Sequence, residues 1–240
     1  MSLLKKKIFV FVVALLVVLG AASAFADTGT YLTLTSAGNN IMDGVYVGPY
    51  YATITQNNVP QYNQQVICDD FSDESFVGHT WSATVNTFAT LSNTLWGQQL
   101  ISQYGQAQGL QTAYQLYGEA ATLAFKMLSL PSSQQGLYSF AIWAIFNPNG
   151  VKNQVSGSEW TQIQALIAGV QNLHFDKTSF ANLLIFTPTN NGISCGVGNC
   201  PAQEFFVFTP EGGTALAYLL LAGLSCMLAM RFRVRRGHVA

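Results

Sequence analysis

The first third of the chain alternates β-branched or aromatic residues with polar ones, and turn-forming residues separate the alternating runs. The pattern occupies residues 30–35, 50–55 and 81–85. The runs Gly38-Asn39-Asn40 and Gln56-Asn57-Asn58, and also Gly78, separate these segments. A period of two residues, bounded by glycine and asparagine, is typical of strands in an antiparallel sheet. Two later segments, 182–188 and 203–208, predict a return to strands.

The apolar period changes to that of a helix in the middle of the chain. The first helical stripe ends before Pro131 and consists of Tyr114, Tyr117, Ala121, Ala124, Phe125 and Leu128. Ser132 and Gln135 then form a capping-box pattern, which predicts a second helix through Phe146. This second helix is apolar on every side, so we expect it to be buried at the centre of the domain.

A third helix is predicted beyond Asn147-Pro148-Asn149-Gly150, a run that ends the second one. Ser156 and Glu159 form another capping box at its start. Its apolar face consists of Trp160, Ile163, Leu166, Ile167 and Val170. Strands on both sides of these helices predict an α+β fold for residues 27–208, with an antiparallel β-rich scaffold, sandwich or barrel-like, and a helical insertion. About 180 residues suit one domain with a sizeable core.

The N-terminus has the three parts of a secretory signal peptide. Lys5, Lys6 and Lys7 precede a continuous apolar run over residues 8–19, and Ala24-Phe25-Ala26 matches the A-x-A cleavage pattern. The apolar run is too short to span a bilayer comfortably. We therefore expect export by the general secretion machinery and removal of residues 1–26 by signal peptidase.

The C-terminus has the pattern of a membrane anchor. Residues 214–230 are apolar or small, and a helix of this length reaches about 25 Å, the short end of a transmembrane span. The segment that follows, 231–240, contains Arg231, Arg233, Arg235 and Arg236. Positive charge marks the cytoplasmic side of a transmembrane helix, so the region between the two apolar segments should lie outside the inner membrane.

The two ends conceal the charge of the region between them. That region holds three lysines against all eleven acidic residues of the chain, a net charge of −8, whereas the whole chain has a net charge of −1. Such a surface repels nucleic acid and anionic lipid. Nucleic acid is therefore not an expected partner.

The run Thr209-Pro210-Glu211-Gly212-Gly213, with the apolar segment and arginines that follow, resembles the sorting signal of PEP-CTERM proteins. In that family a Pro-Glu-Pro motif, a transmembrane helix and an Arg-rich tail are recognised by exosortase, a membrane peptidase. Gly212 replaces the second proline of the motif. The resemblance implies that 209–240 is a sorting signal, and that the protein is associated with exopolysaccharide or biofilm material.

Two of the four cysteines predict a local disulfide. Cys195 and Cys200 lie in a glycine-rich run, and the predicted export route is oxidising. A zinc site is the alternative, but the chain offers no second pair of ligands at zinc-like spacing. Cys226 falls inside the predicted anchor. Cys68 is therefore left without an obvious partner.

The segment around Cys68, taken with Ala141-Ile142-Trp143, resembles thioester-type surface domains. In that family a cysteine bonds to a glutamine side chain two positions before the alanine, which gives an electrophile that captures nucleophiles. Here that position is Ser139, whose hydroxyl has no acyl carbon. Gln134 and Gln135 lie about one helical turn earlier. The resemblance implies a vestigial thioester site at Cys68, Ser139 and Trp143, with a working thioester or a simple buried thiol as alternatives.

Three further patterns in the sequence bear on possible chemistry. The acidic cluster of Asp69, Asp70, Asp73 and Glu74 favours a solvated loop over a calcium site, since the EF-hand spacing is absent. Ser194 lies in a G-x-S-x-G run, but no helix is expected after it and no suitably placed histidine follows. A glycan-binding surface could be lined by Tyr46, Tyr50, Tyr51, Tyr62, Trp81 and Trp96.

Together these patterns predict a non-enzymatic exported protein of the cell surface or extracellular matrix, without metal or cofactor. The alternatives are a covalent thioester adhesin that uses Cys68 and a carbohydrate-binding surface module. The expected partners are signal peptidase, an exosortase-type membrane peptidase and exopolysaccharide.

Overall fold

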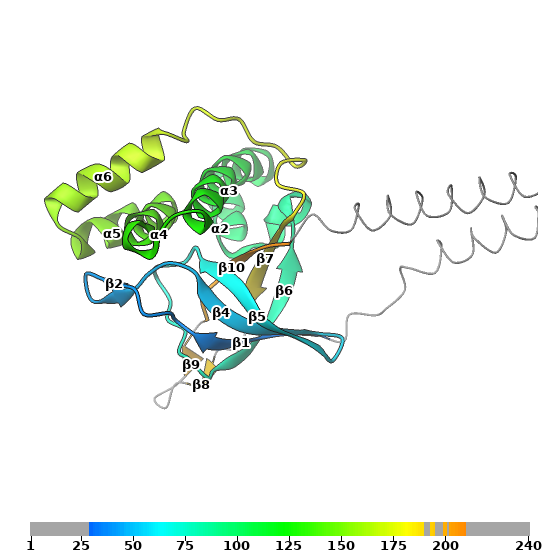
Figure 1. Ribbon diagram of the computed structural model, residues 1–240. Helices are drawn as coiled ribbons and strands as arrows, with labels where there is room; N and C mark the ends of the chain where they lie inside the picture. The colour runs from blue at the N-terminus through cyan, green and yellow to red at the C-terminus, as the bar shows by residue number, and fades with distance from the viewer. Residues whose placement is uncertain (1–28, 190–192, 195–198, 201, 210–240) are drawn as a thin grey trace, which may run out of the picture.

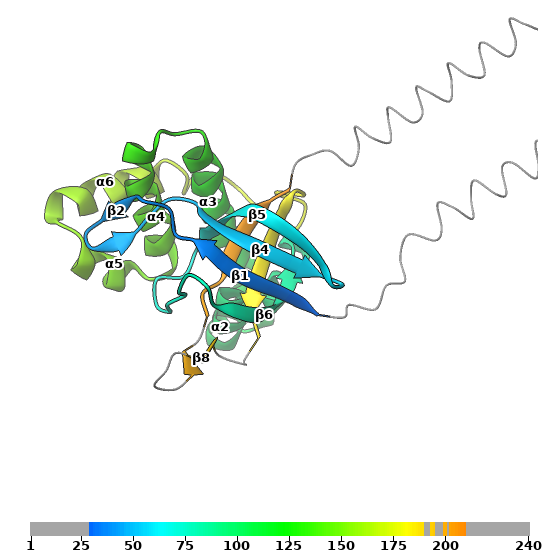
Figure 2. The same cartoon turned by 60° about the horizontal axis from the view of Figure 1, so that its bottom comes forward.

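The computed structural model describes residues 29–189, 193–194, 199–200 and 202–209. These residues form a closed antiparallel barrel with a helical layer packed on it (Figures 1 and 2). The barrel order is β1-β4-β5-β10-β7-β6. Its strands are β1 (Thr30–Ser36), β4 (Tyr50–Gln56), β5 (Val59–Cys68), β6 (Thr80–Asn86), β7 (Leu183–Pro188) and β10 (Phe205–Phe208). The α+β prediction is confirmed, and the scaffold is a barrel.

The helical insertion lies between β6 and β7, as the sequence predicts. It consists of η1 (Phe88–Asn93), α2 (Leu95–Tyr104), α3 (Gln106–Leu128), α4 (Ser132–Phe146), α5 (Pro148–Gln154) and α6 (Gly157–Ala168). Helix α4 packs against both α3 and α6. Its residues 139–144 are all buried, which confirms the central position that its uniform hydrophobicity predicted.

The strands of the barrel bury alternate residues. In β1, Leu32 and Leu34 face the core, whereas Tyr31 and Thr35 are exposed. The same alternation in β4 buries Ala52 and Ile54 and exposes Tyr51. The core therefore begins inside the barrel and continues under α3 and α4. The side chains that β1, β4 and β5 present on the outer face of the barrel are mostly tyrosine, threonine and glutamine.

Two local predictions for the helices need correction. Helix α4 begins without a capping box, because Ser132 is its first residue and Pro131 occupies the N-cap, where it has no side-chain acceptor. Phe125 does not join the buried stripe of α3 but is 58% exposed, beside Phe208. The capping box of Ser156 and Glu159 is confirmed at the start of α6.

Two short hairpins complete the described chain. Strands β2 (Ile41–Met42) and β3 (Val45–Tyr46) form one, and β8 (Ile193–Ser194) and β9 (Asn199–Cys200) form the other. None of the helices in the described ranges is both long and apolar enough to cross a bilayer. The predicted signal peptide and the predicted anchor over 214–230 lie outside those ranges.

Candidate functional site

Cys68 is the last residue of β5 and lies at the end of the barrel beneath α4. Its side chain is 2% exposed, and its backbone pairs with Phe205 of β10. The indole Nε1 of Trp143 donates a hydrogen bond of 3.0 Å to the Cys68 carbonyl oxygen. This bond connects β5 to α4. The structure thus brings together Cys68 and Trp143, which the sequence separates by 75 residues.

Ser139 lies one helical turn before Trp143 on the buried side of α4. Its Oγ accepts a hydrogen bond of 2.8 Å from the backbone N–H of Gly48 and lies 3.5 Å from the Met127 sulfur. Gly48 lies two residues before Tyr50, the first residue of β4, which pairs with Val66 of β5. The Ser139 hydroxyl is therefore already bonded to the segment that leads into β4.

The thiol of Cys68 is held in its neutral form. Its Sγ donates to the Asp70 carbonyl oxygen at 3.0 Å and accepts from the Asp70 N–H at 3.4 Å. Burial raises the pKa of the Cys68 thiol well above its usual value, and the nearby carboxyl groups of Asp70 and Asp69 raise it further. Because the thiolate is the reactive form of cysteine, this environment suppresses nucleophilic chemistry.

Gln134 and Gln135 are the other residues whose acyl groups the sequence offers to the thiol, and Gln134 is exposed. Gln135 is half-buried. Its Nε2 donates to the carbonyl oxygen of Leu130 at 3.0 Å, and its side chain contacts Gly48 on the open side of α4. It precedes Trp143 by two helical turns, a rise of about 12 Å. The helix therefore carries Gln135 away from the residue that contacts Cys68.

A pair of buried carboxyl groups lies next to the cysteine. The sequence identifies Asp69 as a candidate but gives no clear sign of its partner, Glu204. Asp69 and Glu204 are both fully buried. Glu204 accepts hydrogen bonds from the Leu95 N–H at 2.9 Å, from the Tyr117 hydroxyl at 2.5 Å and from the Thr187 hydroxyl. Among the described residues, neither carboxyl oxygen of Asp69 has a hydrogen-bond donor. The only sign of Glu204 in the sequence is that it is an acidic residue directly before an apolar strand.

The proton of this pair belongs on Asp69. Two carboxyl groups that share a buried site cannot both ionise at ordinary cost. Burial raises the pKa of Asp69 well above its usual range, and the negative charge of Glu204 adds to the effect. Burial also raises the pKa of Glu204, but its three donors favour the charged form. A protonated Asp69 can then donate to the Glu204 carboxylate beside it.

The acidic cluster after Cys68 is not the solvated loop that was expected. Asp70 is fully buried like Asp69, whereas Asp73 is half-buried and Glu74 is exposed. One Asp70 oxygen accepts from the Ser72 N–H at 2.8 Å. Burial raises the pKa of the Asp70 carboxyl to about 7, with Asp73 contributing. No cluster of three or more metal-ligating side chains occurs within the described parts of the chain.

The remaining predicted sites are only partly described. Thr209 closes the barrel end, where its N–H donates to the Asn182 carbonyl oxygen at 2.8 Å. The other sorting-signal residues lie outside the described residues. Cys195 does too, and Cys200 is described only by its backbone pairing in β9, so the predicted disulfide stays a prediction. Ser194 of β8 pairs with Asn199 of β9, and the residues directly after it lie outside the described ranges.

The aromatic residues considered for a glycan surface divide into two groups. Tyr50 and Trp81 are core residues, and Trp96 stacks on Phe146 at a centroid distance of 5.2 Å. In contrast, the tyrosines of the outer barrel face and of the β2–β3 hairpin are exposed. These exposed rings are Tyr31, Tyr46, Tyr51 and Tyr62.

No protein-family model matches the chain, and no curated protein matches its sequence. Three solved structures have a similar chain path. The N-terminal thioester domain of a surface protein from Clostridium perfringens is 10% identical, with a TM-score of 0.42 over 76% of this chain and 99% of that one. The N-terminal domain of the Streptococcus pyogenes pilus tip adhesin Cpa is 10% identical, with a TM-score of 0.40 over 78% and 97%. The N-terminal thioester domain of the fibronectin-binding protein SfbI from Streptococcus pyogenes is 11% identical, with a TM-score of 0.39 over 78% and 97%.

Proposed function

We propose that the chain is a non-enzymatic exported protein of the cell surface or extracellular matrix, in which the plan of a thioester-type domain carries no thioester. The single observation that carries this proposal is the state of Ser139. Its hydroxyl takes the position at which the sequence resemblance requires a glutamine, and it accepts a hydrogen bond from Gly48 instead. The site then serves to fasten α4 to the end of the barrel.

The chemistry of a thioester makes this substitution decisive. The thiol sulfur must bond to the acyl carbon of a carboxamide, whose C–N bond breaks, and the nitrogen leaves as ammonia after taking up the proton that the thiol loses. Ser139 provides no acyl carbon, and the Nε2 of Gln135 already donates to the carbonyl oxygens of Met127 in α3 and of Leu130 just after it. The Cys68 thiol is buried and neutral. These features support a structural cysteine over a covalent adhesin.

Export and retention complete the proposal. Signal peptidase would release residues 1–26, and the anchor at 214–230 would hold the acidic domain outside the inner membrane. An exosortase-type peptidase would then act at the segment around Pro210, Glu211 and Gly212. The resemblance of this tail to PEP-CTERM signals supports association with exopolysaccharide or biofilm.

Mass spectrometry tests the chemical part of the proposal. The full chain is purified without reducing agent, and its intact mass is measured before and after incubation with methylamine. We expect no change, because no thioester is present to be opened. Cys68→Ala provides the matched control and should give the same unchanged result.

A gain of one methylamine in the natural chain, absent from Cys68→Ala, would establish a thioester and overturn the proposal. Ser139→Ala provides a further comparison. It leaves the Gly48 N–H without its acceptor and should cost about 1–3 kcal/mol of unfolding free energy, because buried donors are expensive to leave unpaired.

A further inference from the structure

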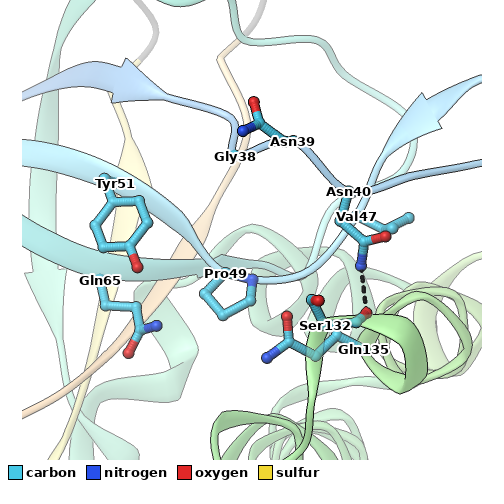
Figure 3. A pocket seen from close by; sticks show the side chains of 9 residues that line it. All are labelled: Gly38, Asn39, Asn40, Val47, Pro49, Tyr51, Gln65, Ser132 and Gln135. Carbon is cyan, nitrogen blue, oxygen red and sulfur yellow. Dashed lines mark hydrogen bonds between the residues drawn. The ribbon is translucent and has the colours of Figure 1, made fainter.

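A hollow of about 310 Å³ opens where the outer face of the barrel meets the start of α4. The chain after β1, the strands β4 and β5, and the first turn of α4 border it (Figure 3). Its size falls at the lower end of the range for small-molecule sites, about 300–1,000 Å³. Cys68 and Ser139 do not line it, and Gln135 is the one lining residue that was considered above for the cysteine chemistry.

Carboxamide groups supply the polar lining of the hollow. Gln65 of β5 and Gln135 of α4 extend their amides toward each other from its two sides, below Pro49 (Figure 3). Asn39 lies at its upper border. In this part of the described chain the side chains of Asn39 and Gln65 form no hydrogen bond within the protein. Each amide both donates and accepts, which matches hydroxyl groups that do the same.

Gln135 is held in place before any ligand arrives. Its Nε2 donates to the carbonyl oxygens of Leu130 at 3.0 Å and Met127 at 3.4 Å. Gly48 has a φ of +94° and no side chain, and a Cβ there would lie 2.9 Å from the Gln135 Oε1. The glycine therefore leaves room for the amide, whose Oε1 stays free to accept. Such preorganisation reduces the entropy lost on binding.

Tyr51 supplies an aromatic surface at the same place. Its side chain is 40% exposed, and it stands directly opposite Gln65 in the β4–β5 register. A phenol ring combines an apolar face with a polar edge, and the face suits the C–H side of a pyranose ring. The ring and the Gln65 amide thus form one wall of the hollow.

Charge is absent from the lining, and this selects the class of ligand. Asp43 is the only charged residue in 29–68, the segment that provides most of the lining, and it does not border the hollow. None of the three lysines of the exported region lines it either. Phosphorylated and anionic ligands would therefore find no counter-charge here, in a region whose net charge is negative.

We propose that this hollow binds a neutral saccharide unit, which stacks on Tyr51 and exchanges hydrogen bonds with Gln65, Asn39 and Gln135. An uncharged ligand with many hydroxyl groups and one apolar face uses every group that the lining offers. The inference rests on the proposed function, because it names a site through which a surface protein would contact polysaccharide.

Isothermal titration tests the proposal with the full chain in lipid nanodiscs, which avoid sugar-based detergents. The probes are cellohexaose, laminarihexaose, maltohexaose and mannohexaose, with tetragalacturonic acid and an uncharged Ser/Thr-rich peptide for comparison. We expect at least one neutral hexasaccharide to bind. Tyr51→Ala should weaken that binding at least about fivefold, as removal of an aromatic contact worth about 1 kcal/mol would.

The control variants separate the pocket from the general surface. Tyr51→Phe keeps the ring and should retain binding, Gln65→Ala should weaken it, and Tyr62→Ala removes an exposed tyrosine that does not line the hollow and should change nothing. Circular dichroism verifies that each variant is folded. The proposal is overturned by no binding of any neutral probe at millimolar concentration, by equal loss in Tyr62→Ala, or by preference for the peptide or the acidic sugar. Cell fractionation of Tyr51→Ala distinguishes failure of the binding proposal from failure of the proposed function. The variant should still reach the cell surface, because surface location should not depend on this pocket.

Discussion

At the scale of single residues, one side chain decides the chemistry of the Cys68 region. Hydrogen bonds fix the position of Cys68. The Trp143 indole donates to its carbonyl oxygen, and its sulfur is hydrogen-bonded to the backbone of Asp70. What the site lacks is an acyl carbon, because Ser139 ends in a hydroxyl that is bonded to Gly48. Under the proposed thioester plan, hydrogen bonds fix the position of the cysteine, and the residue at 139 decides whether an acyl carbon is available.

The buried carboxyl groups make the stability of the domain depend on pH, and Asp70 gives a clear test. Its pKa is about 7 in the folded chain against an ordinary value of 3.8. Between these values the folded state keeps a proton that the unfolded state releases, so the contribution of Asp70 to stability is complete below about pH 4 and is lost as the pH rises to about 7. Asp70→Asn cannot ionise, so it should reduce this loss by about 1 kcal/mol per pH unit.

Urea unfolding, followed by tryptophan fluorescence at intervals from pH 4 to pH 8, measures this difference. Asp69, Asp73 and Glu204 face the same group and contribute in both proteins, so the comparison between variants is the relevant quantity. Glu74→Gln alters an exposed acid of the same loop and should keep the natural slope. Equal slopes for Asp70→Asn and the natural chain would mean that Asp70 is ionised when folded.

At the scale of elements, periodicity in the sequence predicts most of the described fold. Strands β1, β4 and β6 alternate visibly. Helix α4 is apolar on every side, and it packs against α3, α5 and α6. The sequence does not predict strand β5, because its first half is mostly polar and contains Pro60. The pairing of β10 reaches only Ile67 and Cys68, so the missing N–H of Pro60 breaks no bond with that strand.

The polar part of the site was less predictable than the fold. Glu204 lies 135 residues after Asp69, and only the pairing of β5 with β10 brings the two strand ends together. The Tyr117 hydroxyl reaches Glu204 from α3, a helix whose stripe the sequence identifies only as apolar. Contacts of this kind depend on tertiary register, for which a single sequence contains no local signal.

Close packing of α3 against the chain after α6 gives a prediction at this scale. A Cβ at Gly118 would lie 2.1 Å from the ring of Phe175, which is buried and stacks on Phe180. Gly118→Ala should therefore lower the unfolding free energy by about 1–3 kcal/mol, as overpacking of a core does. Urea unfolding measures the change.

The control for this prediction is another helical glycine. Gly157, the first residue of α6, has nothing within 4 Å of a built Cβ. Gly157→Ala should leave stability unchanged or raise it by a few tenths of a kcal/mol, because alanine favours the helix. A loss as large as that of Gly118→Ala would show that the contact with Phe175 is not the cause.

At the scale of the whole molecule, both ends of the described chain lie on the side away from α5 and α6 (Figures 1 and 2). Thr209 is bonded to Asn182 at the barrel end, only a few residues before the predicted anchor. The domain would therefore be held close to the membrane until its tail is cut. The region between the two terminal apolar segments has a net charge of −8, which would disfavour direct contact with anionic lipid.

Glu211 tests whether the tail is read as a sorting signal. If an exosortase-type peptidase recognises Pro210 and Glu211, the natural chain should leave the membrane fraction of a host that contains such an enzyme, whereas Glu211→Ala should stay there with its arginine-rich end attached. Immunoblotting of cell fractions measures both proteins. Glu74→Ala removes an exposed acid of the domain and should behave as the natural chain does. Retention of all three proteins in the membrane would make the C-terminal segment a permanent anchor, since a tail that is never removed keeps its apolar helix in the bilayer.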